Sequence, residues 1–390
     1  MARIVLDLRW VRSDVLDGIA RVSLCYAAEL LRREDHDYVL LFANNRLKTF
    51  CMSWIHDYDA NNDASRPLRS WCALVCGFDA RSFLNRTRLP ELLRPFSPEA
   101  YLSFYYIFHP VLPRSCRNFA MVHDLTPLKF PAYFKKASLL FRGLLRHPWG
   151  VKLLLSQAHE VITVSRSTRR DLQMLYRGSV HVVYPGVQVR VHTPLHTPLH
   201  SDIQPLLPDP YILQVGRADP HKNQRGTLRA YAALEPALRQ QFTLVFAGPT
   251  DSRYTPALQA EAIALGVQDR VIFTGALSST TLQSVYANAI VTVFPSFYEG
   301  FGLPVLEAMA QGVPVIVSEA ASLPEVAGDA ALYVNPSDTR ALTQQLVEVL
   351  NSAQRRKYLI EKGLQRVPHF HWASTVDGFL KVLRTSLSSL

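Results

Sequence analysis

The feature that most restricts the fold is an alternation of short apolar runs and amphipathic stretches in the second half of the chain. Stretches with helical periodicity, such as Gln224–Leu234 and Thr281–Ala287, separate the apolar runs. The alternation predicts a parallel sheet with helices on both faces, as in a doubly wound α/β domain. The expected strands are Tyr211–Val215, Phe242–Ala247, Val271–Thr274, Ile290–Phe294 and Val313–Val317.

The first half repeats this scheme less regularly, and 390 residues are enough for two domains that each bury a core. We therefore expect an α/β fold of two Rossmann-like, doubly wound domains facing a cleft, with ligands bound outside the carboxyl ends of the strands. The strands expected in the first half are Arg3–Leu8, Tyr38–Ala43, Ala100–Phe104, Asn118–Val122, Val161–Val164 and His181–Val183.

A proline-rich stretch, VHTPLHTPLHSDIQPLLPDP, separates the halves and contains the tetrapeptide His-Thr-Pro-Leu twice. This composition is typical of a linker. Its histidines recur every four residues, but the prolines prevent them from sharing a helix face, so we expect no metal site there. The expected domains are residues 1–190, which bind the acceptor, and residues 209–370, which bind the donor. Residues 191–208 are the linker, and residues 371–390 form a C-terminal helix that packs back on the first domain.

The formal net charge of +10 lies in the first half of the chain. Residues 1–190 hold 27 Lys and Arg against 16 Asp and Glu, a net charge of +11, which leaves 15 against 16 for residues 191–390. A basic half suggests a polyanionic partner, such as nucleic acid, acidic lipid or a phosphorylated substrate.

The five cysteines are odd in number and lack paired CxxC spacing, so we expect reduced thiols in a cytosolic protein. Cys72 and Cys76 are spaced to share one helix face, but two thiols make no zinc site without partners. The chain starts with an apparent strand and not with a secretion signal. No apolar run reaches the roughly 18 residues that span a bilayer.

The stretch SFYEGFGLPVLEAMAQGVPVIVS, residues 296–318, carries two glutamates around a glycine-rich turn. It follows a buried strand, so Glu299 is expected on the loop and Glu307 one turn into the next helix. Gly300 and Gly302 allow backbone N–H groups to approach a ligand at the positive end of that helix. Such a loop suits an anionic or polyhydroxyl ligand, since hydroxyl groups donate hydrogen bonds to carboxylates.

A second stretch, QVGRADPHKN at residues 214–223, follows the first strand of this half. Arg217 and Lys222 lie beside Gly216 on a strand-to-helix turn. Together they are able to hold a diphosphate, the arginine as a planar fork and the lysine as a point charge. This turn and Glu299 both follow strands of one sheet.

These motifs resemble the retaining glycosyltransferases of family 4, which have the GT-B fold. The resemblance rests on GR-x4-KN, on the Glu-x7-Glu run, and on SLPEVAGDAALYVNP. In the first half it is sparser and rests on DGIARVS, MVHDLTPLKFP, VITVSRSTRRDL and VVYPGV. The stretch with His-Asp-Leu-Thr-Pro is most similar to a branch of bacterial mannosyltransferases that make surface polysaccharides.

The resemblance implies roles for the matching residues. Glu307 is expected to accept hydrogen bonds from the nucleotide ribose, and Glu299 to lie near the donor sugar. Arg217 and Lys222 are expected to neutralise the departing diphosphate, and His123 to face the donor sugar from the first domain. The expected catalytic residues are His123, Glu299, Arg217 and Lys222, and the expected donor-binding residues are Gly18, Gly216, Gly300, Phe301, Gly302, Leu303 and Glu307. Ala20 stands where the family often has a second glycine, which suggests a stiffer loop around Gly18.

No metal or other cofactor is expected, because arginine and lysine are able to stabilise a diphosphate leaving group. Two Asp-x-Asp pairs, Asp35 with Asp37 and Asp57 with Asp59, have the spacing of a metal clamp. Both lie in polar stretches of the first half, and we interpret them as loop carboxylates.

Residues 134–155, FKKASLLFRGLLRHPWGVKLLL, interleave basic side chains with Leu, Phe and Trp. Such a segment either packs on the core with a solvated basic face or lies on an anionic membrane surface. The charge of the first half favours the membrane. We therefore expect a cytoplasmic protein that is peripheral on the inner face of the cytoplasmic membrane.

The leading hypothesis is a metal-independent, retaining hexosyltransferase. It would move mannose from GDP-mannose onto a growing surface glycan, with a lipid-diphosphate-linked oligosaccharide as a fitting acceptor. The alternatives are a UDP-hexose donor, a synthase or phosphorylase of a soluble disaccharide, and a non-catalytic subunit that binds a glycan or nucleotide sugar. No nucleic-acid-binding module is recognisable, so nucleic acid is not an expected partner.

Overall fold

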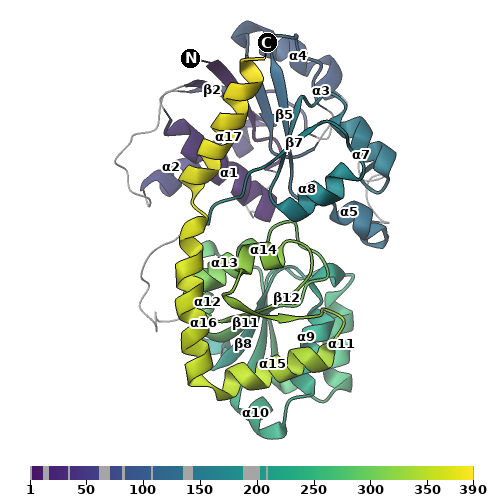
Figure 1. Cartoon of the computed structure of the whole chain (residues 1–390), viewed down its shortest axis with the longest axis vertical. Coiled ribbons are helices and arrows are strands. Elements are labelled where there is room, and N and C mark those ends of the chain that lie inside the picture. The colour runs from purple at the N-terminus through teal and green to yellow at the C-terminus, as the bar shows by residue number, and fades with distance from the viewer. Residues whose placement is uncertain are drawn as a thin grey trace. The chain divides into compact units, whose positions relative to one another are not determined.

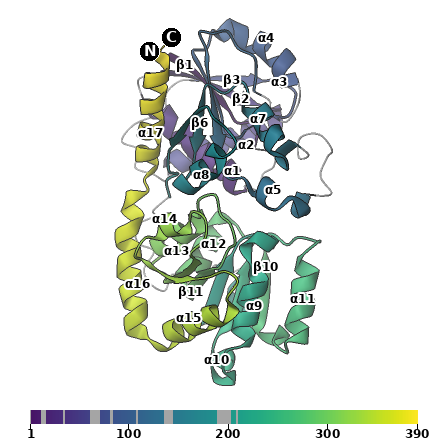
Figure 2. The ribbon, with the colours of Figure 1, turned by 45° about the vertical axis from the view of Figure 1, so that its right-hand side comes forward.

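A computed structural model describes residues 2–11, 17–33, 36–60, 71–80, 84–106, 109–134, 144–187, 203–207 and 210–389. The chain divides into two compact units. The first comprises Met1–Gly186 together with His371–Leu390, and the second comprises Val187–Phe370 (Figures 1 and 2).

The described residues of the first unit form a seven-stranded sheet in the order β3-β2-β1-β4-β5-β6-β7, and every neighbouring pair is parallel. The strands are β1 Ala2–Asp7, β2 His36–Phe42, β3 Cys72–Val75, β4 Ala100–Ser103, β5 Arg117–Val122, β6 Glu160–Thr163 and β7 Ser179–Val182. The helices are α1 Gly18–Leu31, α2 Asn45–Ala60, α3 Leu84–Thr87, α4 Leu89–Leu93, α5 Thr126–Lys129, α7 Pro148–Leu155, α8 Arg166–Gln173 and α17 Trp372–Leu387, with 3-10 turns η1 Arg94–Phe96 and η2 Pro131–Phe134.

Helices cover both faces of this sheet. Successive side chains of a strand point to opposite faces, so each face has its own buried contacts. Val5 and Tyr101 pair across β1 and β4 and pack with Leu89 of α4 on one face. On the other face, Phe119 of β5 packs edge-on against Phe379 of α17, with ring centroids 5.5 Å apart. Aromatic packing of this kind contributes beyond simple area burial.

The C-terminal helix α17 belongs to the first unit, although about 190 residues separate it in sequence from that unit's last strand. It lies against α1, where Phe379 also contacts Tyr26 at 5.9 Å between centroids. Arg117 of β5 donates to the Ser386 carbonyl at 3.2 Å, and Thr375 donates to the Tyr184 carbonyl at 2.8 Å. These contacts attach the end of the chain to the unit that contains its start.

The described residues of the second unit form a six-stranded parallel sheet in the order β10-β9-β8-β11-β12-β13. The strands are β8 Tyr211–Val215, β9 Thr243–Ala247, β10 Val271–Gly275, β11 Ala289–Phe294, β12 Val315–Ser318 and β13 Ala331–Val334. The helices are α9 Gln224–Ala232, α10 Pro236–Gln241, α11 Thr255–Ala264, α12 Ser279–Ala287, α13 Leu303–Ala310, α14 Leu323–Ala327, α15 Thr339–Asn351 and α16 Ala353–Arg366, with 3-10 turns η3 Gln204–Leu206, η4 Pro220–Lys222, η5 Gln268–Arg270 and η6 Val367–His369.

One face of this second sheet is closed by α9 and α15. Ile212, Val291 and Ile316 from its central strands share a buried cluster with Leu228 of α9 and Leu346 of α15. The central strands are buried along their length, as expected for a parallel sheet covered on both faces. The prediction of two parallel-sheet, Rossmann-like domains is therefore confirmed.

Several local predictions were wrong. Cys72 lies in strand β3 and not on a helix, and β3 and β13 were not predicted as strands. Asp37 lies in β2 and Asp57 in α2, so neither is a loop carboxylate. Asp35 lies outside the described residues.

The predicted linker and the predicted basic segment both lie partly outside the described residues. Of the predicted linker, residues 191–208, the structure describes only residues 203–207, which include η3. Residues 135–143 of the basic segment also lie outside. The described remainder is not one helix, because a turn at Arg146 and His147 precedes α7. Among the helices that the structure describes, none combines the length and hydropathy that crossing a bilayer requires.

Candidate functional site

The candidate site lies at the carboxyl ends of β8 and β11, which are neighbours in the second sheet. Chain order reverses between these two strands, since β9 and β10 extend the sheet to one side and β12 and β13 to the other. Ligands bind at such a reversal point in doubly wound sheets. The loops that leave β8 and β11 carry Lys222 and Glu299.

Lys222 and Glu299 form an ion pair that joins these two loops. The Lys222 Nζ lies 2.8 Å from the Glu299 Oε1, and the Ser296 hydroxyl donates to the same oxygen at 2.9 Å. Only 19% of the Lys222 side chain and 15% of the Glu299 side chain are exposed. Burial raises the pKa of Glu299, but Lys222 and His221 outweigh burial and hold this pKa below its usual value. The carboxylate is therefore ionised beside a cation.

The turn from β8 to α9 places the Lys222 side chain against backbone. Gly216 has φ +139°, and a Cβ at this position would lie 2.8 Å from the Lys222 Cδ. Only glycine therefore fits beneath the lysine without displacing it. The buried Gln214 donates through Nε2 to the Lys222 carbonyl at 2.8 Å and holds the turn from inside.

Asn223 ties three strand-end loops together. Its amide donates to the Pro295 carbonyl after β11 at 3.0 Å and to the Pro336 carbonyl after β13 at 2.7 Å. Its Oδ1 accepts from the Gly226 amide and caps α9. Asn223 has φ +57°, which asparagine tolerates better than most residues. The lysine and the carboxylate thus rest on loops that are cross-linked.

The glycine-rich loop before α13 is held from the segment between β12 and α14. The Ser322 hydroxyl contacts the Glu299 carbonyl at 2.9 Å and the Phe301 carbonyl at 2.8 Å. Gly302 has φ +107° at the N-cap of α13, followed by Leu303 and Pro304 in the first turn. The carbonyls of this loop are bound inside the protein, at the end of the helix that attracts negative charge.

Glu307 lies on α13 as expected, one turn into the helix. The Tyr286 hydroxyl of α12 donates to its Oε2 at 3.1 Å, and the side chain is half-buried. Glu299, in contrast, pairs with Lys222 on the loop. The two glutamates therefore have separate surroundings on one loop-helix unit.

Arg217 does not join the lysine in this structure. Its side chain is 56% exposed, and its Nε pairs with the Asp219 carboxylate at 2.9 Å. Its carbonyl accepts from the Gln224 amide at 2.9 Å, which fixes the backbone and leaves the guanidinium near the surface. The two expected cations therefore lie on one turn, but each pairs with a different carboxylate.

A shallow hollow, open to solvent, lies beside Gly216. Gly248 after β9 closes one wall, and a Cβ there would meet the Gly216 carbonyl at 2.6 Å. Phe246 and Phe273 line the apolar wall, with rings stacked 5.2 Å apart. The hollow adjoins the turn that carries Lys222.

His123 and Gly18 belong to the first unit. His123 follows β5 and is buried, and its Nε2 donates to the Phe104 carbonyl at 2.8 Å, since a carbonyl only accepts. Burial lowers the pKa of His123 further than this hydrogen bond and Asp124 raise it, so the ring is neutral with Nδ1 as the acceptor. The neighbouring Asp124 carboxylate accepts from the Thr126 amide at 2.7 Å. Gly18 is exposed and is the first residue of helix α1, with Ala20 buried two residues later, so the chain is helical from Gly18 onward.

Both units match families of known sequence. Residues 17–191 match Glycosyltransferase Family 4, and residues 200–366 match Glycosyl transferases group 1. O-antigen chain mannosyltransferase B of Escherichia coli is 31% identical over 309 residues, which cover 75% of this chain and 76% of the relative. The chain belongs to the family 4 glycosyltransferases.

A second relative supports this assignment, and a solved structure shares the fold of the glycosyltransferase. O-antigen chain mannosyltransferase RfbU of Salmonella typhimurium is 31% identical over 238 residues, which cover 60% of this chain and 61% of the relative. The structure of Anabaena HepE in complex with UDP and glucose covers 100% of its own chain and 99% of this one, at 16% identity and a TM-score of 0.72. At that identity the likeness concerns the fold alone, which is GT-B.

The sequence did not predict which residues of the glycosyltransferase hold the site loops and Glu307 in place by hydrogen bonds. Asn223 and Ser322 both stand in the motifs that suggested the family, yet nothing in their spacing indicates which carbonyls they bind. Tyr286, which holds Glu307, lies in an amphipathic helix and looks like core packing. Within the described residues, no three His, Cys, Asp or Glu side chains cluster as metal ligands.

Proposed function

We propose that this glycosyltransferase transfers mannose from GDP-mannose to a surface glycan, with retention of the anomeric configuration. The observation that carries the proposal is the Lys222–Glu299 contact at the reversal point of the second sheet. The mannosyl specificity is supported by the two relatives, which are O-antigen chain mannosyltransferases. A lipid-diphosphate-linked oligosaccharide is the proposed acceptor.

In this proposal, cationic side chains of the second unit bind the diphosphate of the donor. Lys222 exchanges part of its contact with Glu299 for the diphosphate, whose charge grows as the bond to the sugar breaks. Arg217 is exposed enough to turn from Asp219 toward the same group. Fixed cations next to a leaving group stabilise the transition state, so the reaction is proposed to need no metal ion.

Glu299 and Glu307 have different proposed roles because they stand in different places. Glu307, held by Tyr286, accepts hydrogen bonds from the ribose. Glu299, already ionised beside Lys222, faces the sugar carbon as it becomes cation-like. We keep His123 as a contact of the donor sugar and Gly18 as a donor-binding position, on the strength of the family resemblance.

A donor-hydrolysis screen tests this proposal. GDP-mannose, UDP-glucose, UDP-galactose and UDP-N-acetylglucosamine are each incubated with the protein, with and without EDTA, and the release of nucleoside diphosphate is measured. We expect release from GDP-mannose above the other donors, and the same rate in EDTA. Preference for a UDP sugar contradicts the donor assignment, and loss of activity in EDTA with recovery on addition of Mn²⁺ contradicts metal independence.

We further propose that the first unit binds anionic membranes through α3, α4 and α7. Arg86 of α3 donates to the Leu153 carbonyl and to the Ser156 hydroxyl, at 3.4 and 3.1 Å, so α3 lies beside α7 (Figures 1 and 2). Trp149 is 60% exposed, and Lys152 next to it on α7 is also exposed. The exposed large apolar side chains of these helices are Leu84, Leu92, Trp149 and Leu153.

Exposed apolar side chains among basic ones are suited to an anionic lipid surface. We therefore expect phosphatidylglycerol vesicles to retain the protein at low salt and to release it as salt screens the charges. The double variant Trp149→Ser, Lys152→Gln is expected to sediment less with these vesicles than wild type, whereas Lys357→Gln, at an 80% exposed position on α16, serves as the control. Equal binding to neutral phosphatidylcholine vesicles would show that charge is not the cause.

A further inference from the structure

The loop that carries Glu299, residues 297–302, is in direct contact with the start of helix α14. This helix begins after Ser322, whose hydroxyl contacts the Glu299 and Phe301 carbonyls at 2.9 and 2.8 Å. The first residue of α14, Leu323, packs closely against Gly302, where a Cβ would lie 2.8 Å from the Leu323 Cδ2. A shift of α14 would therefore shift the loop as well.

Arg366, the last residue of α16, binds the other end of α14. Its Nε donates to the Val326 carbonyl at 2.9 Å, and its Nη2 donates to the Glu325 carbonyl at 2.8 Å. The last four carbonyls of a helix lack partners within it, and the arginine supplies donors to two of them. Gly328 has φ +57°, and a Cβ there would lie 3.3 Å from the Arg366 Nε, so glycine leaves room for the guanidinium.

Phe370 makes a second contact between the end of α16 and the Glu299 loop. Its ring packs edge-on against the Phe301 ring, with centroids 5.6 Å apart and an interplanar angle of 72°, and both side chains are buried. The Arg366 guanidinium lies over the Phe370 ring at 5.1 Å from its centroid, a favourable contact between a cation and an aromatic face. The two residues that support the loop therefore also support each other.

The backbone of Phe370 is fixed at both of its polar groups. Its amide donates to the Val367 carbonyl at 3.0 Å, and its carbonyl accepts from the Val187 amide at 3.0 Å. Val187 and Phe370 are the first and last residues of the second unit, so this bond joins the two ends of the unit. The Glu299 loop thus packs against the point where the chain enters and leaves the second unit.

We propose that Arg366 and Phe370 are positioning residues that hold the Glu299 loop in the geometry required for sugar transfer. Phe370 supports the loop directly through Phe301, and Arg366 supports it through α14. Such support matters because a misplacement of about 1 Å can lower a reaction rate about a hundredfold. The inference rests on the proposed function for the role of Glu299 toward the donor sugar. Arg366 and Phe370 act through the loop and not on the substrate.

Amide hydrogen exchange, measured by mass spectrometry with no donor present, tests whether these residues hold the loop. Peptides covering residues 297–302 are expected to exchange about tenfold faster in Arg366→Met and Phe370→Leu than in wild type, with strand β8 unchanged, because the loop opens more often. Lys362→Met is the matched control, since Lys362 also extends from α16 and pairs at 2.7 Å with Asp329, which is 71% exposed. Wild-type exchange of the loop in both variants overturns the inference, as does equal acceleration in Lys362→Met.

Kinetics then show whether the support acts through Glu299. Arg366→Met is expected to lower kcat about tenfold in the wild-type chain but to have little further effect in Glu299→Gln, because residues that act as a unit are not additive. Arg366→Lys keeps a donor and is expected to recover most of kcat. Equal factors in the two backgrounds contradict the inference. If wild type transfers no sugar from any donor, the proposed function fails, and hydrogen exchange alone decides whether the loop is held.

Discussion

Replacing Lys222 by alanine is expected to lower kcat about a hundredfold or more, with a smaller change in the donor KM. The lysine is the half-buried cation of the candidate site, and its contact with the diphosphate strengthens as negative charge develops on the leaving oxygen. Loss of such an interaction lowers kcat more than ground-state binding. Steady-state kinetics with GDP-mannose measure the effect.

The surroundings of Lys222 supply the control for this experiment. Arg225 is the next basic residue along the chain. It lies on α9, is 58% exposed and pairs with Glu261 of α11. Arg225→Ala removes the same charge close by, and we expect little change in kcat because exposed ion pairs contribute little. A wild-type kcat in folded Lys222→Ala would remove the lysine from the mechanism.

The two glutamates are expected to fail in different ways. Glu299→Gln keeps an oxygen that accepts from Lys222 but removes the negative charge, so kcat is expected to fall about a hundredfold with a smaller change in donor KM. Glu307→Gln is expected to raise the donor KM more than it lowers kcat, since the ribose is bound alike in the ground and transition states. The opposite pattern would show that the two roles are exchanged.

The sequence predicts the second unit better than the first, for physical reasons. β8 was predicted with its observed bounds, because its five residues are all buried and bounded by turn residues. β3 was missed because none of its four residues is fully buried, which weakens the apolar signal. β13 is likewise only four residues long. Short edge strands carry too few residues for periodicity to reveal them.

The motifs predict which loops form the site, but not which side chains meet there. The placement of Glu299 on the loop and Glu307 on the helix follows from the strand, glycine and proline signals. The contact between Lys222 and Glu299 does not, because it depends on the φ of Gly216 and on the cross-link through Asn223. The outward orientation of Arg217 follows from its pairing with Asp219, which competes with any neighbour across the sheet.

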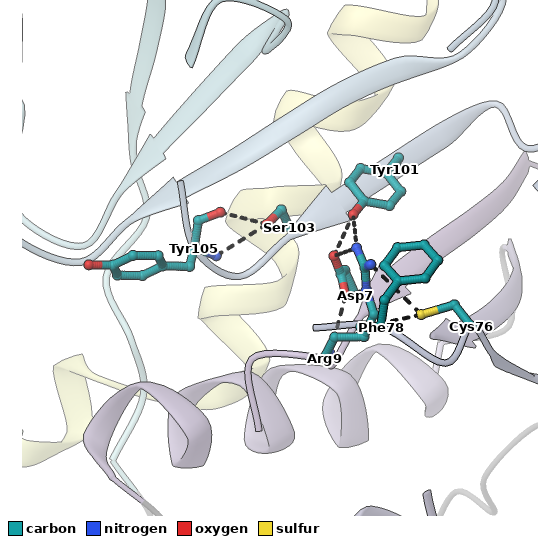
Figure 3. Close-up of polar contacts among 7 residues, drawn as sticks. All are labelled: Asp7, Arg9, Cys76, Phe78, Tyr101, Ser103 and Tyr105. Carbon is teal, nitrogen blue, oxygen red and sulfur yellow. Dashed lines mark hydrogen bonds and ion pairs between the residues drawn. The ribbon is translucent and has the colours of Figure 1, made fainter. Parts of the chain in front are cut away.

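A buried ion pair in the first unit shows the same limit, since Arg9 is 1% exposed and donates to both carboxylate oxygens of Asp7 (Figure 3). In the sequence, Asp7, Arg9 and Trp10 are ordinary residues at the end of a strand. Tyr101 and Phe78, which complete the cluster, come from distant segments. The pairing of β1 with β4 brings Tyr101 to Asp7, and the turn after β3 brings Phe78 to Arg9, so the buried charge was not predictable from local spacing.

Titration calorimetry with GDP tests the central claim most directly, because it asks whether the second unit's site binds a nucleoside diphosphate and what each glutamate contributes. Wild type is expected to bind GDP, and Glu299→Gln at least as tightly, since the diphosphate then no longer competes with a carboxylate for Lys222. Glu307→Gln is expected to bind GDP weakly because the ribose contact is lost. Weak binding to Glu299→Gln with normal binding to Glu307→Gln, or the absence of GDP binding to wild type, would contradict the account.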